Sequence, residues 1–205
     1  MSLRSVLLDG ARVKPGKIVC IGRNYVDHIH ELGNEVPDEM VVFIKPNSAI
    51  SGELYAVHQE PLHYETEICF LVKNKGLAAV GIGLDLTKRA LQSRLKERAL
   101  PWERAKAFDG SAVFSDFVAI DELPGALRIE LDINGAPAQR GEMAQMIHLP
   151  QQILRECQTF LTLDDNDILM TGTPKGVGQV QPGDQFTARL YLDDELLIEA
   201  NWLAK

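Results

Sequence analysis

The sequence has 205 residues, enough for one domain, and 45% hydrophobic and 24% charged residues place it among ordinary globular proteins. Its formal net charge of −8 argues against a nucleic-acid-binding surface, because such a surface needs a basic face. Asp9 interrupts the short apolar start, which argues against a signal peptide, and no window is long enough for a membrane span. We therefore expect a cytoplasmic protein that binds neither nucleic acid nor membranes.

The first half of the chain consists of short apolar runs separated by polar and turn residues. Alternation, apolar spacing and the positions of glycine and proline predict its elements. The expected strands cover residues 17–22, 40–45, 65–73 and 79–87, and the expected helices cover 24–32 and 87–99.

The second half is dominated by hairpins. Leu127 to Ile133 alternates apolar and polar residues and then meets Asn134-Gly135, a strong hairpin signal. A helix over 149–161 and strands over 167–171 and 185–192 are expected next, with a last hairpin at Asp193-Asp194 leading into 196–202. Because strands and helices do not alternate regularly, we predict a strand-rich α+β fold with a few short helices.

The three cysteines, Cys20, Cys69 and Cys157, show no Cys-x-x-Cys spacing. Each lies among apolar neighbours, which is typical of a buried thiol and not of a disulfide framework. We expect all three to be buried and reduced.

Two glutamates, Glu65 and Glu67, stand one residue apart at the start of an apolar strand. A strand has a side-chain period of two, so both point to one face, which an exposed strand end would tolerate. Asp85 favours another interpretation, because its apolar neighbours predict burial and a buried carboxylate is costly without a partner. Three converging carboxylates would suit a hard divalent ion such as Mg²⁺, Mn²⁺ or Ca²⁺.

Other polar residues have spacings that suit a site. His28 and Glu31 are three apart, so on a helix the carboxylate could orient the imidazole, although an exposed amphipathic helix explains the same pattern. Arg89 and Gln92 share a helical face that could meet a carboxylate. Residue type alone predicts that Lys106 is a solvated surface lysine.

Six segments together carry a resemblance to a known family. They are IVCIGRNYVDHIHELG from residue 18, VFIKP from 42, HYETEI from 63, GIGLDLTKRALQ from 81, LPWERAKAFDGS from 100 and ILMTGTPKGVGQVQPGD from 168. In this order they resemble the fumarylacetoacetate hydrolase family, and within it the small single-domain members that act on acylpyruvates and oxaloacetate. The resemblance covers about residues 17 to 200. One departure is the short stretch 73–80, where the family usually carries a longer segment with a helix.

The resemblance implies the architecture and the cofactor. The fold would be a mixed β-roll or sandwich, with an N-terminal segment over 1–16 and the catalytic domain over 17–205. The chain would form a homodimer. One Mg²⁺ or Mn²⁺ would be held by Glu65, Glu67 and Asp85.

The resemblance also implies roles for other residues. His28 and Glu31 would be a water-activating pair on a mobile lid segment, and Lys106 would stabilise a developing enolate. Without the resemblance, the run from Thr171 to Gly178 is equally well explained as a glycine turn between strands. The candidate substrate ligands are Arg23, Lys45, Arg89, Gln92, Gly172 and Thr173.

The principal functional prediction is a metal-dependent hydrolase that cleaves the carbon–carbon bond of acylpyruvates such as acetylpyruvate or fumarylpyruvate. Its products would be pyruvate and a carboxylic acid. The alternatives are an oxaloacetate decarboxylase or keto–enol tautomerase, an isomerase or decarboxylase of aromatic meta-cleavage intermediates, and a non-catalytic relative that binds a ligand. The enzymatic alternatives overlap because hydrolysis, decarboxylation and tautomerisation all pass through an enolate.

Overall fold

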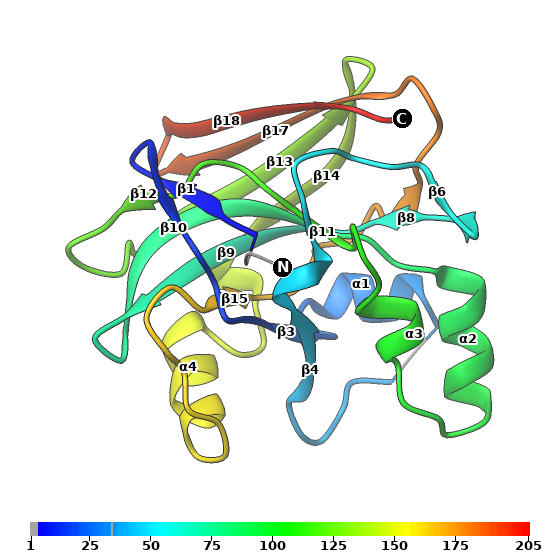
Figure 1. Ribbon diagram of the computed structural model, residues 1–205, viewed down its shortest axis with the longest axis horizontal. Coiled ribbons are helices and arrows are strands. Elements are labelled where there is room, and N and C mark those ends of the chain that lie inside the picture. The colour runs from blue at the N-terminus through cyan, green and yellow to red at the C-terminus, as the bar shows by residue number, and fades with distance from the viewer. Residues whose placement is uncertain (1–3, 34) are drawn as a thin grey trace.

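The computed structural model describes residues 4–33 and 35–205, in which a large curled sheet faces a smaller one (Figure 1). The large sheet is mixed, since β3 and β15 run parallel whereas β9 and β10 form an antiparallel hairpin. Its order is β4 (Val41–Pro46), β3 (Lys17–Gly22), β15 (Ile168–Met170), β9 (Thr66–Lys73), β10 (Gly76–Asp85), β11 (Ala112–Phe114) and β5 (Ile50–Ser51), with β12 (Val118–Ala119) also pairing with β10.

The smaller sheet is fully antiparallel and contains both hairpins expected in the second half. Asn134 and Gly135 form the turn of the first hairpin, and both have positive φ angles, of 52° and 77°. The sheet order is β14 (Ala136–Glu142), β13 (Leu127–Ile133), β17 (Gln185–Leu192) and β18 (Glu195–Leu203).

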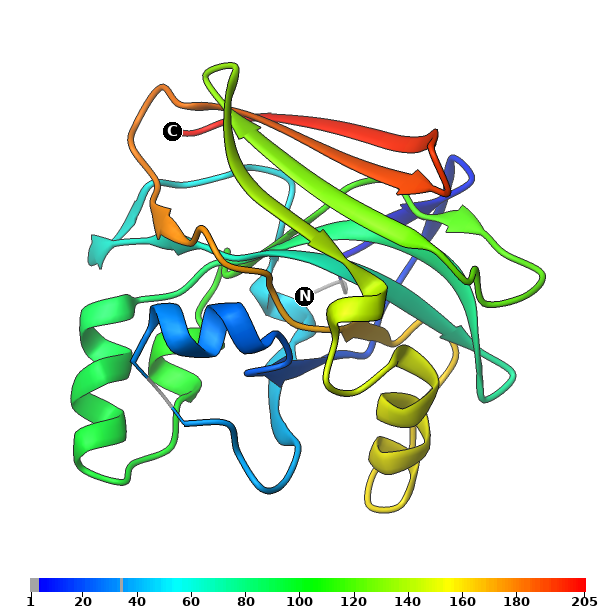
Figure 2. The ribbon, with the colours of Figure 1, turned by 180° about the vertical axis from the view of Figure 1, so that it is seen from behind.

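Short strand pairs and helices complete the fold. The pairs are β1 (Val6–Leu8) with β2 (Ala11–Val13), β6 (Val57–His58) with β7 (Glu60–Pro61), and β8 (His63–Tyr64) with β16 (Gly178–Gln179). The helices are α1 (Val26–Glu31), α2 (Arg89–Glu97), α3 (Glu103–Lys106) and α4 (Pro150–Gln158), and 3₁₀ turns cover Asn47–Ala49 and Met143–Gln145. Figures 1 and 2 show α1, α2 and α3 grouped together at one end of the large sheet.

Both faces of the large sheet are buried, which explains why its strands are apolar runs without alternation. On β9, Ile68 and Phe70 face the core between the two sheets. Cys69 and Leu71 face a second core, which also contains Phe117. Glu67 is on the same face of β9 as Cys69, so the acidic pair stands at the edge of this second core.

The β9–β10 hairpin positions the acidic residues of the two strands relative to each other. Its turn consists of Asn74 and Lys75, both with positive φ, and replaces the longer segment expected from the family. The register pairs Glu67 with Gly83, and the Asp85 amide donates to the Glu65 carbonyl at 2.8 Å. Side chains opposite each other in a ladder share a face, so the register brings the three carboxylates together.

Most elements expected from the sequence are confirmed, and the chain is a strand-rich α+β fold. Helix α1 is shorter than the expected 24–32, and β10 begins at Gly76 instead of 79. The β1–β2 hairpin, α3 and the short strands β5 to β8, β11, β12 and β16 were not predicted. The three cysteines are buried and unpaired, as expected. No helix of the described chain has the length and hydropathy needed to cross a membrane.

Candidate active site

Three carboxylates converge at the end of the β9–β10 hairpin. Glu65, Glu67 and Asp85 each offer an oxygen that lies within 4.8 Å of the oxygens of the other two. Their exposed fractions are 6%, 2% and 1%, so the interpretation as an exposed strand end is wrong. We call these three residues the acidic triad.

Within the acidic triad, the pKa values of Glu65 and Glu67 are shifted in opposite directions. Burial raises the pKa of Glu67 well above its usual value, and the negative charges of Asp85 and Glu65 raise it further. Burial also disfavours ionised Glu65, but the cations Lys106 and Arg89 outweigh it and hold the pKa of Glu65 below its usual value. Within residues 4–33 and 35–205, Glu67 has no ion-pair partner, and the Gly172 amide donates to its Oε2 at 2.8 Å.

Two buried lysines satisfy the other two carboxylates. Lys106 Nζ donates to Glu65 Oε2 and Asp85 Oδ2, each at 2.7 Å, and to Thr87 Oγ1 at 2.6 Å. Lys45 Nζ lies 2.9 Å from Asp85 Oδ1. Lys106 is 3% exposed, so the expectation of a solvated lysine is wrong. Burial lowers the pKa of Lys106, but Asp85 and Glu65 more than compensate, so its pKa is raised and it stays charged.

The donor set of the acidic triad fits a hard divalent cation. All three ligands are carboxylate oxygens, which Mg²⁺ and Mn²⁺ prefer over softer metals. Among the residues that the structure describes, Glu67 is a buried carboxylate without an ion-pair partner, and its charge is costly unless a cation neutralises it. A divalent ion on the acidic triad would supply that partner.

The loop from Thr171 to Gly178 contacts the acidic triad through the backbone amide of Gly172. Gly172 has a φ of +98°, and a Cβ there would lie 2.8 Å from Asn24 Cβ, so only glycine can bring this amide to Glu67. Thr173 Oγ1 donates to the Thr66 carbonyl at 2.9 Å and accepts from Gln139 Nε2 at 2.9 Å. The hydroxyl of Thr173 is thus used within the protein, although Thr173 also lines the pocket described below.

Helix α1 brings a histidine to the open side of the acidic triad. His28 Nδ1 lies 3.2 Å from Glu31 Oε2, and the Gly176 amide donates to Glu31 Oε1 at 3.0 Å. His28 is buried, so the alternative of an exposed histidine on an amphipathic helix is wrong. Since the carboxylate holds Nδ1, the other ring nitrogen, Nε2, remains to exchange a proton.

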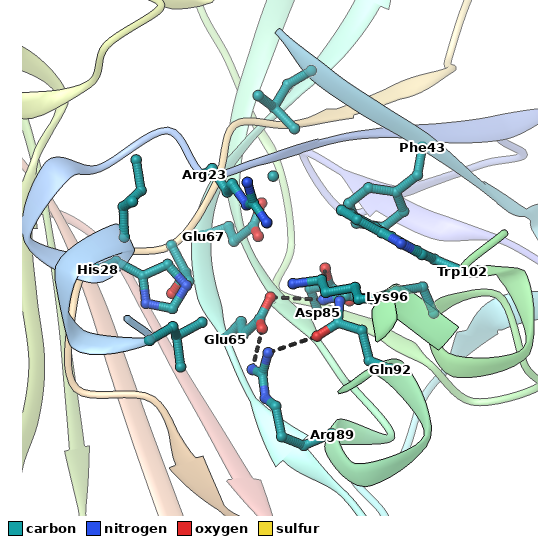
Figure 3. Close-up of a pocket in the computed structure, with 16 residues that line it drawn as sticks. Arg23, His28, Phe43, Glu65, Glu67, Asp85, Arg89, Gln92, Lys96 and Trp102 are labelled. Carbon is teal, nitrogen blue, oxygen red and sulfur yellow. Dashed lines mark hydrogen bonds and ion pairs between the residues drawn. The ribbon is translucent and has the colours of Figure 1, made fainter. Parts of the chain in front are cut away.

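A pocket lies between α1, α2 and the acidic triad (Figure 3). Its volume is about 30 Å³, and it contains room for water between the charged side chains. Arg89 pairs with Glu65, and its Nη1 donates to Gln92 Oε1 at 2.8 Å. The candidates that line the pocket are Arg23, His28, Glu65, Glu67, Asp85, Arg89, Gln92, Lys106 and Thr173.

Three of the candidates do not line the pocket. Lys45 is fully buried and contacts Asp85 from the side of the core. Gly172 touches Glu67 through its amide, and Glu31 contacts His28. The geometry gives each of them a positioning contact, and direct substrate contact by Lys45 or Gly172 stays a prediction.

The lining residues that were missed from the sequence include Lys96 and Trp102. Lys96 follows Gln92 by four positions and Arg89 by seven, so all three share one face of α2, and this spacing could have identified it. Its Nζ lies 4.9 Å from the centre of the Trp102 ring. That contact joins α2 to Trp102 in the segment before α3, so helical spacing could not predict it.

Residues 17–197 match the sequence model of a family described as fumarylacetoacetate (FAA) hydrolase, C-terminal. The chain belongs to the fumarylacetoacetate hydrolase family. The oxaloacetate tautomerase YcgM of Escherichia coli (strain K12) is 38% identical over 189 residues, 83% of this chain and 86% of that protein. The mitochondrial oxaloacetate tautomerase FAHD1 of Rattus norvegicus is 36% identical over 188 residues, 83% of this chain and 85% of that protein.

The fold of this family member also matches a solved structure with bound ligands. Fumarylpyruvate hydrolase from Pseudomonas aeruginosa, in complex with Mn²⁺ and pyruvate, superposes with a TM-score of 0.90 at 27% identity. The match covers 100% of this chain and 96% of that one. Relatives in the fumarylacetoacetate hydrolase family are thus enzymes of small oxo acids, and the chain is a member of an enzyme family.

Proposed function

We propose that the chain is a divalent-metal-dependent enzyme that acts on short 2-oxo acids. Its main activity would be the keto–enol tautomerisation of oxaloacetate. The observation that carries the proposal is the buried acidic triad with Lys106 between Glu65 and Asp85. An ammonium ion held in a water-poor pocket stabilises negative charge that develops on a nearby oxygen. The names of the two oxaloacetate tautomerases favour oxaloacetate over other oxo acids.

Residues of the pocket would stabilise the enolate. A divalent ion on the acidic triad would polarise the 2-keto oxygen as a Lewis acid. Lys106 would stabilise, through its positive charge, the negative charge that accumulates on the same oxygen as a proton leaves C3. Gln92 accepts from Arg89 through Oε1, which leaves its amide nitrogen to donate to the substrate. The C3 protons of oxaloacetate are acidic because they lie between two carbonyl groups, so water can carry them.

Hydrolysis of acylpyruvates is the second candidate, and the His28–Glu31 pair favours it. His28 Nε2 would take a proton from water as the hydroxyl oxygen adds to the distal carbonyl carbon. The bond between C3 and that carbon would then break, and its electron pair would form the pyruvate enolate. A proton returning to C3 gives pyruvate, and the distal part leaves as a carboxylic acid. This route shares the enolate, and hence Lys106, with tautomerisation.

The proposal includes Mg²⁺ or Mn²⁺ as the metal, a homodimer as the assembly and the cytoplasm as the location. The Mn²⁺ in the fumarylpyruvate hydrolase structure supports a divalent ion without distinguishing the two metals. Titration of the metal-free protein with each ion, and light scattering of the loaded protein, test the first two points.

A substrate panel tests the proposed function. The purified protein with Mg²⁺ or Mn²⁺ is assayed with oxaloacetate, acetylpyruvate and fumarylpyruvate, and loss of enol absorbance is followed separately from pyruvate release. We expect metal-dependent enol–keto conversion of oxaloacetate, with slower cleavage of the acylpyruvates. If a folded, metal-loaded protein converts none of the three substrates, the proposal is refuted. Cleavage of the acylpyruvates without tautomerisation of oxaloacetate would favour the hydrolase.

A further inference from the structure

Cations other than Lys106 and Arg89, which neutralise the acidic triad, also line the pocket. Four cationic side chains and three carboxylates line the pocket, and Lys106 is committed to Glu65 and Asp85. Arg23 comes from the segment after β3, whereas Arg89 and Lys96 come from α2. Figure 3 shows Arg23 and Arg89 on opposite sides of the acidic triad, with Lys96 on the Trp102 side.

Lys96 is held at the pocket without a carboxylate partner. It forms no ion pair with any residue in 4–33 or 35–205, and its Nζ lies over the Trp102 ring, 4.9 Å from the ring centre. Burial, followed by the positive charges of Arg23, Arg89 and Lys106, lowers the pKa of Lys96 to about 8. An anion bound beside Lys96 would offset these repulsions.

Arg23, another cation of the pocket lining, has an unusual backbone. Its φ is +57°, a left-handed conformation that non-glycine residues rarely adopt. Such conformations persist where the surrounding structure demands them, and they are concentrated at binding sites. The conformation directs an arginine from the end of β3 into the pocket, as Figure 3 shows.

We propose that Lys96 and Arg23 form a subsite for the second carboxylate of a dicarboxylic 2-oxo acid. The inference rests on the proposed function, in which the acidic triad, Lys106 and Gln92 bind the 2-oxo acid end. A second carboxylate, one or a few carbons away, then lies in the outer part of the pocket and needs a cation there. A substrate that ends in a methyl group makes no use of these charges.

This subsite predicts selectivity for the class of substrate. Oxaloacetate and fumarylpyruvate carry a second carboxylate, whereas acetylpyruvate does not. A hydrogen bond to a charged group contributes about 1.5–3 kcal/mol, equivalent to about 10-fold to 100-fold in affinity. Lys96 would therefore favour dicarboxylates by raising their affinity rather than by accelerating the chemical step.

A purely structural role for Lys96 makes a different prediction. If the ammonium only packs on Trp102, its loss would loosen the end of α2 and lower the melting temperature. Every substrate would then be affected alike. The two roles are separated by comparing substrates with and without the second carboxylate.

The test uses the metal-loaded protein and three variants. Lys96→Met removes the charge, Lys96→Arg keeps it, and Arg94→Met removes an exposed charge from the same helix as a matched control. KM and kcat are measured for oxaloacetate and acetylpyruvate. Calorimetry measures binding of pyruvate and of 2-oxoglutarate, which has a second carboxylate.

We expect Lys96→Met to raise the KM for oxaloacetate and weaken 2-oxoglutarate binding by about 10-fold or more, with acetylpyruvate and pyruvate changed less than about twofold. Lys96→Arg should retain most of the dicarboxylate affinity, and Arg94→Met should resemble the parent protein. Equal losses for both classes of ligand, or no loss for dicarboxylates, would overturn the subsite. If the parent protein turns over no oxo acid, the proposed function fails, while calorimetry still reports on the subsite.

Discussion

The two walls of the pocket are built in opposite ways. The inner wall is the acidic triad at the end of the β9–β10 hairpin, where the three carboxylates and Lys106 are all buried. The outer wall includes α1, a six-residue helix whose tethers are exposed, such as the ion pair of Asp27 with Lys175 at 2.8 Å. Fixed charges suit stabilisation of an enolate, whereas a loosely tethered helix suits entry of substrate and delivery of a proton acceptor.

The largest effect is expected at the inner wall. Glu67→Gln should abolish Mn²⁺ binding by calorimetry and lower tautomerisation about 10³-fold, because several kcal/mol of Lewis-acid stabilisation is lost. The metal-free variant should nevertheless be more stable than the parent, since a buried like charge is removed. Its melting temperature should rise about 2–4 °C for each kcal/mol of repulsion relieved. The exposed Glu122→Gln should change neither property, and unaltered Mn²⁺ affinity in Glu67→Gln would contradict the metal site.

A change at the outer wall should separate the two reactions. His28→Gln should reduce acylpyruvate hydrolysis about 10²- to 10⁴-fold, the usual contribution of a general base, and tautomerisation less than about 10-fold. Metal affinity should be unchanged, because His28 belongs to α1 and not to the acidic triad. His30→Gln, at an exposed position of the same helix, is the control. An equal decrease in the rates of hydrolysis and tautomerisation would argue against a role of His28 in hydrolysis alone.

The charge of Lys96 should give the KM for oxaloacetate a pH dependence of intermediate magnitude. Arg23 after β3, Arg89 on α2, Lys106 on α3 and Glu65 before β9 act on this amine, and its pKa is about 8. Lys96 therefore loses its positive charge as pH rises through about 8, so the KM for oxaloacetate should rise there about 10-fold. Acetylpyruvate should show no such rise. Lys96→Arg should remove the pH dependence, and its persistence would assign the titration to another group.

The smallest effect is expected from the exposed tether of α1. Asp27→Asn removes the ion pair with Lys175, and exposed pairs contribute little because solvent screens them. We expect less than about a twofold change in kcat for either reaction. Stopped-flow measurement of substrate entry adds a sensitive check. A large change would mean that this pair controls the position of α1.

Much of the site could be predicted from the pattern of neighbouring residues. The period of two placed Glu65 and Glu67 on one face, and the apolar setting of Asp85 indicated burial. The spacing of three paired His28 with Glu31, which the structure shows at 3.2 Å. These inferences succeeded because each depends on the geometry of one element.

The burial of Lys106 could not be predicted in this way. Its environment comes from Glu65 and Asp85, which lie 41 and 21 residues earlier in the chain. The four-residue helix α3 that carries it is too short to leave a periodic pattern. Lys96 shares a helical face with Arg89 and Gln92, so its place could have been predicted, whereas its contact with Trp102 spans a turn and could not.

The pairing of β10 with β9 shifts register between Leu77 and Ala79. This shift determines where a residue can be inserted or deleted without moving the acidic triad. Leu77 pairs with Val72 and Ala79 with Leu71, so Ala78 is extra in the ladder. One residue gained or lost there leaves Asp85 beside Glu65. The same change between Ala79 and Asp85 would turn the aspartate to the other face. The turn, about 30 Å from Asp85, can therefore vary in length while the end of the hairpin that carries the acidic triad stays the same.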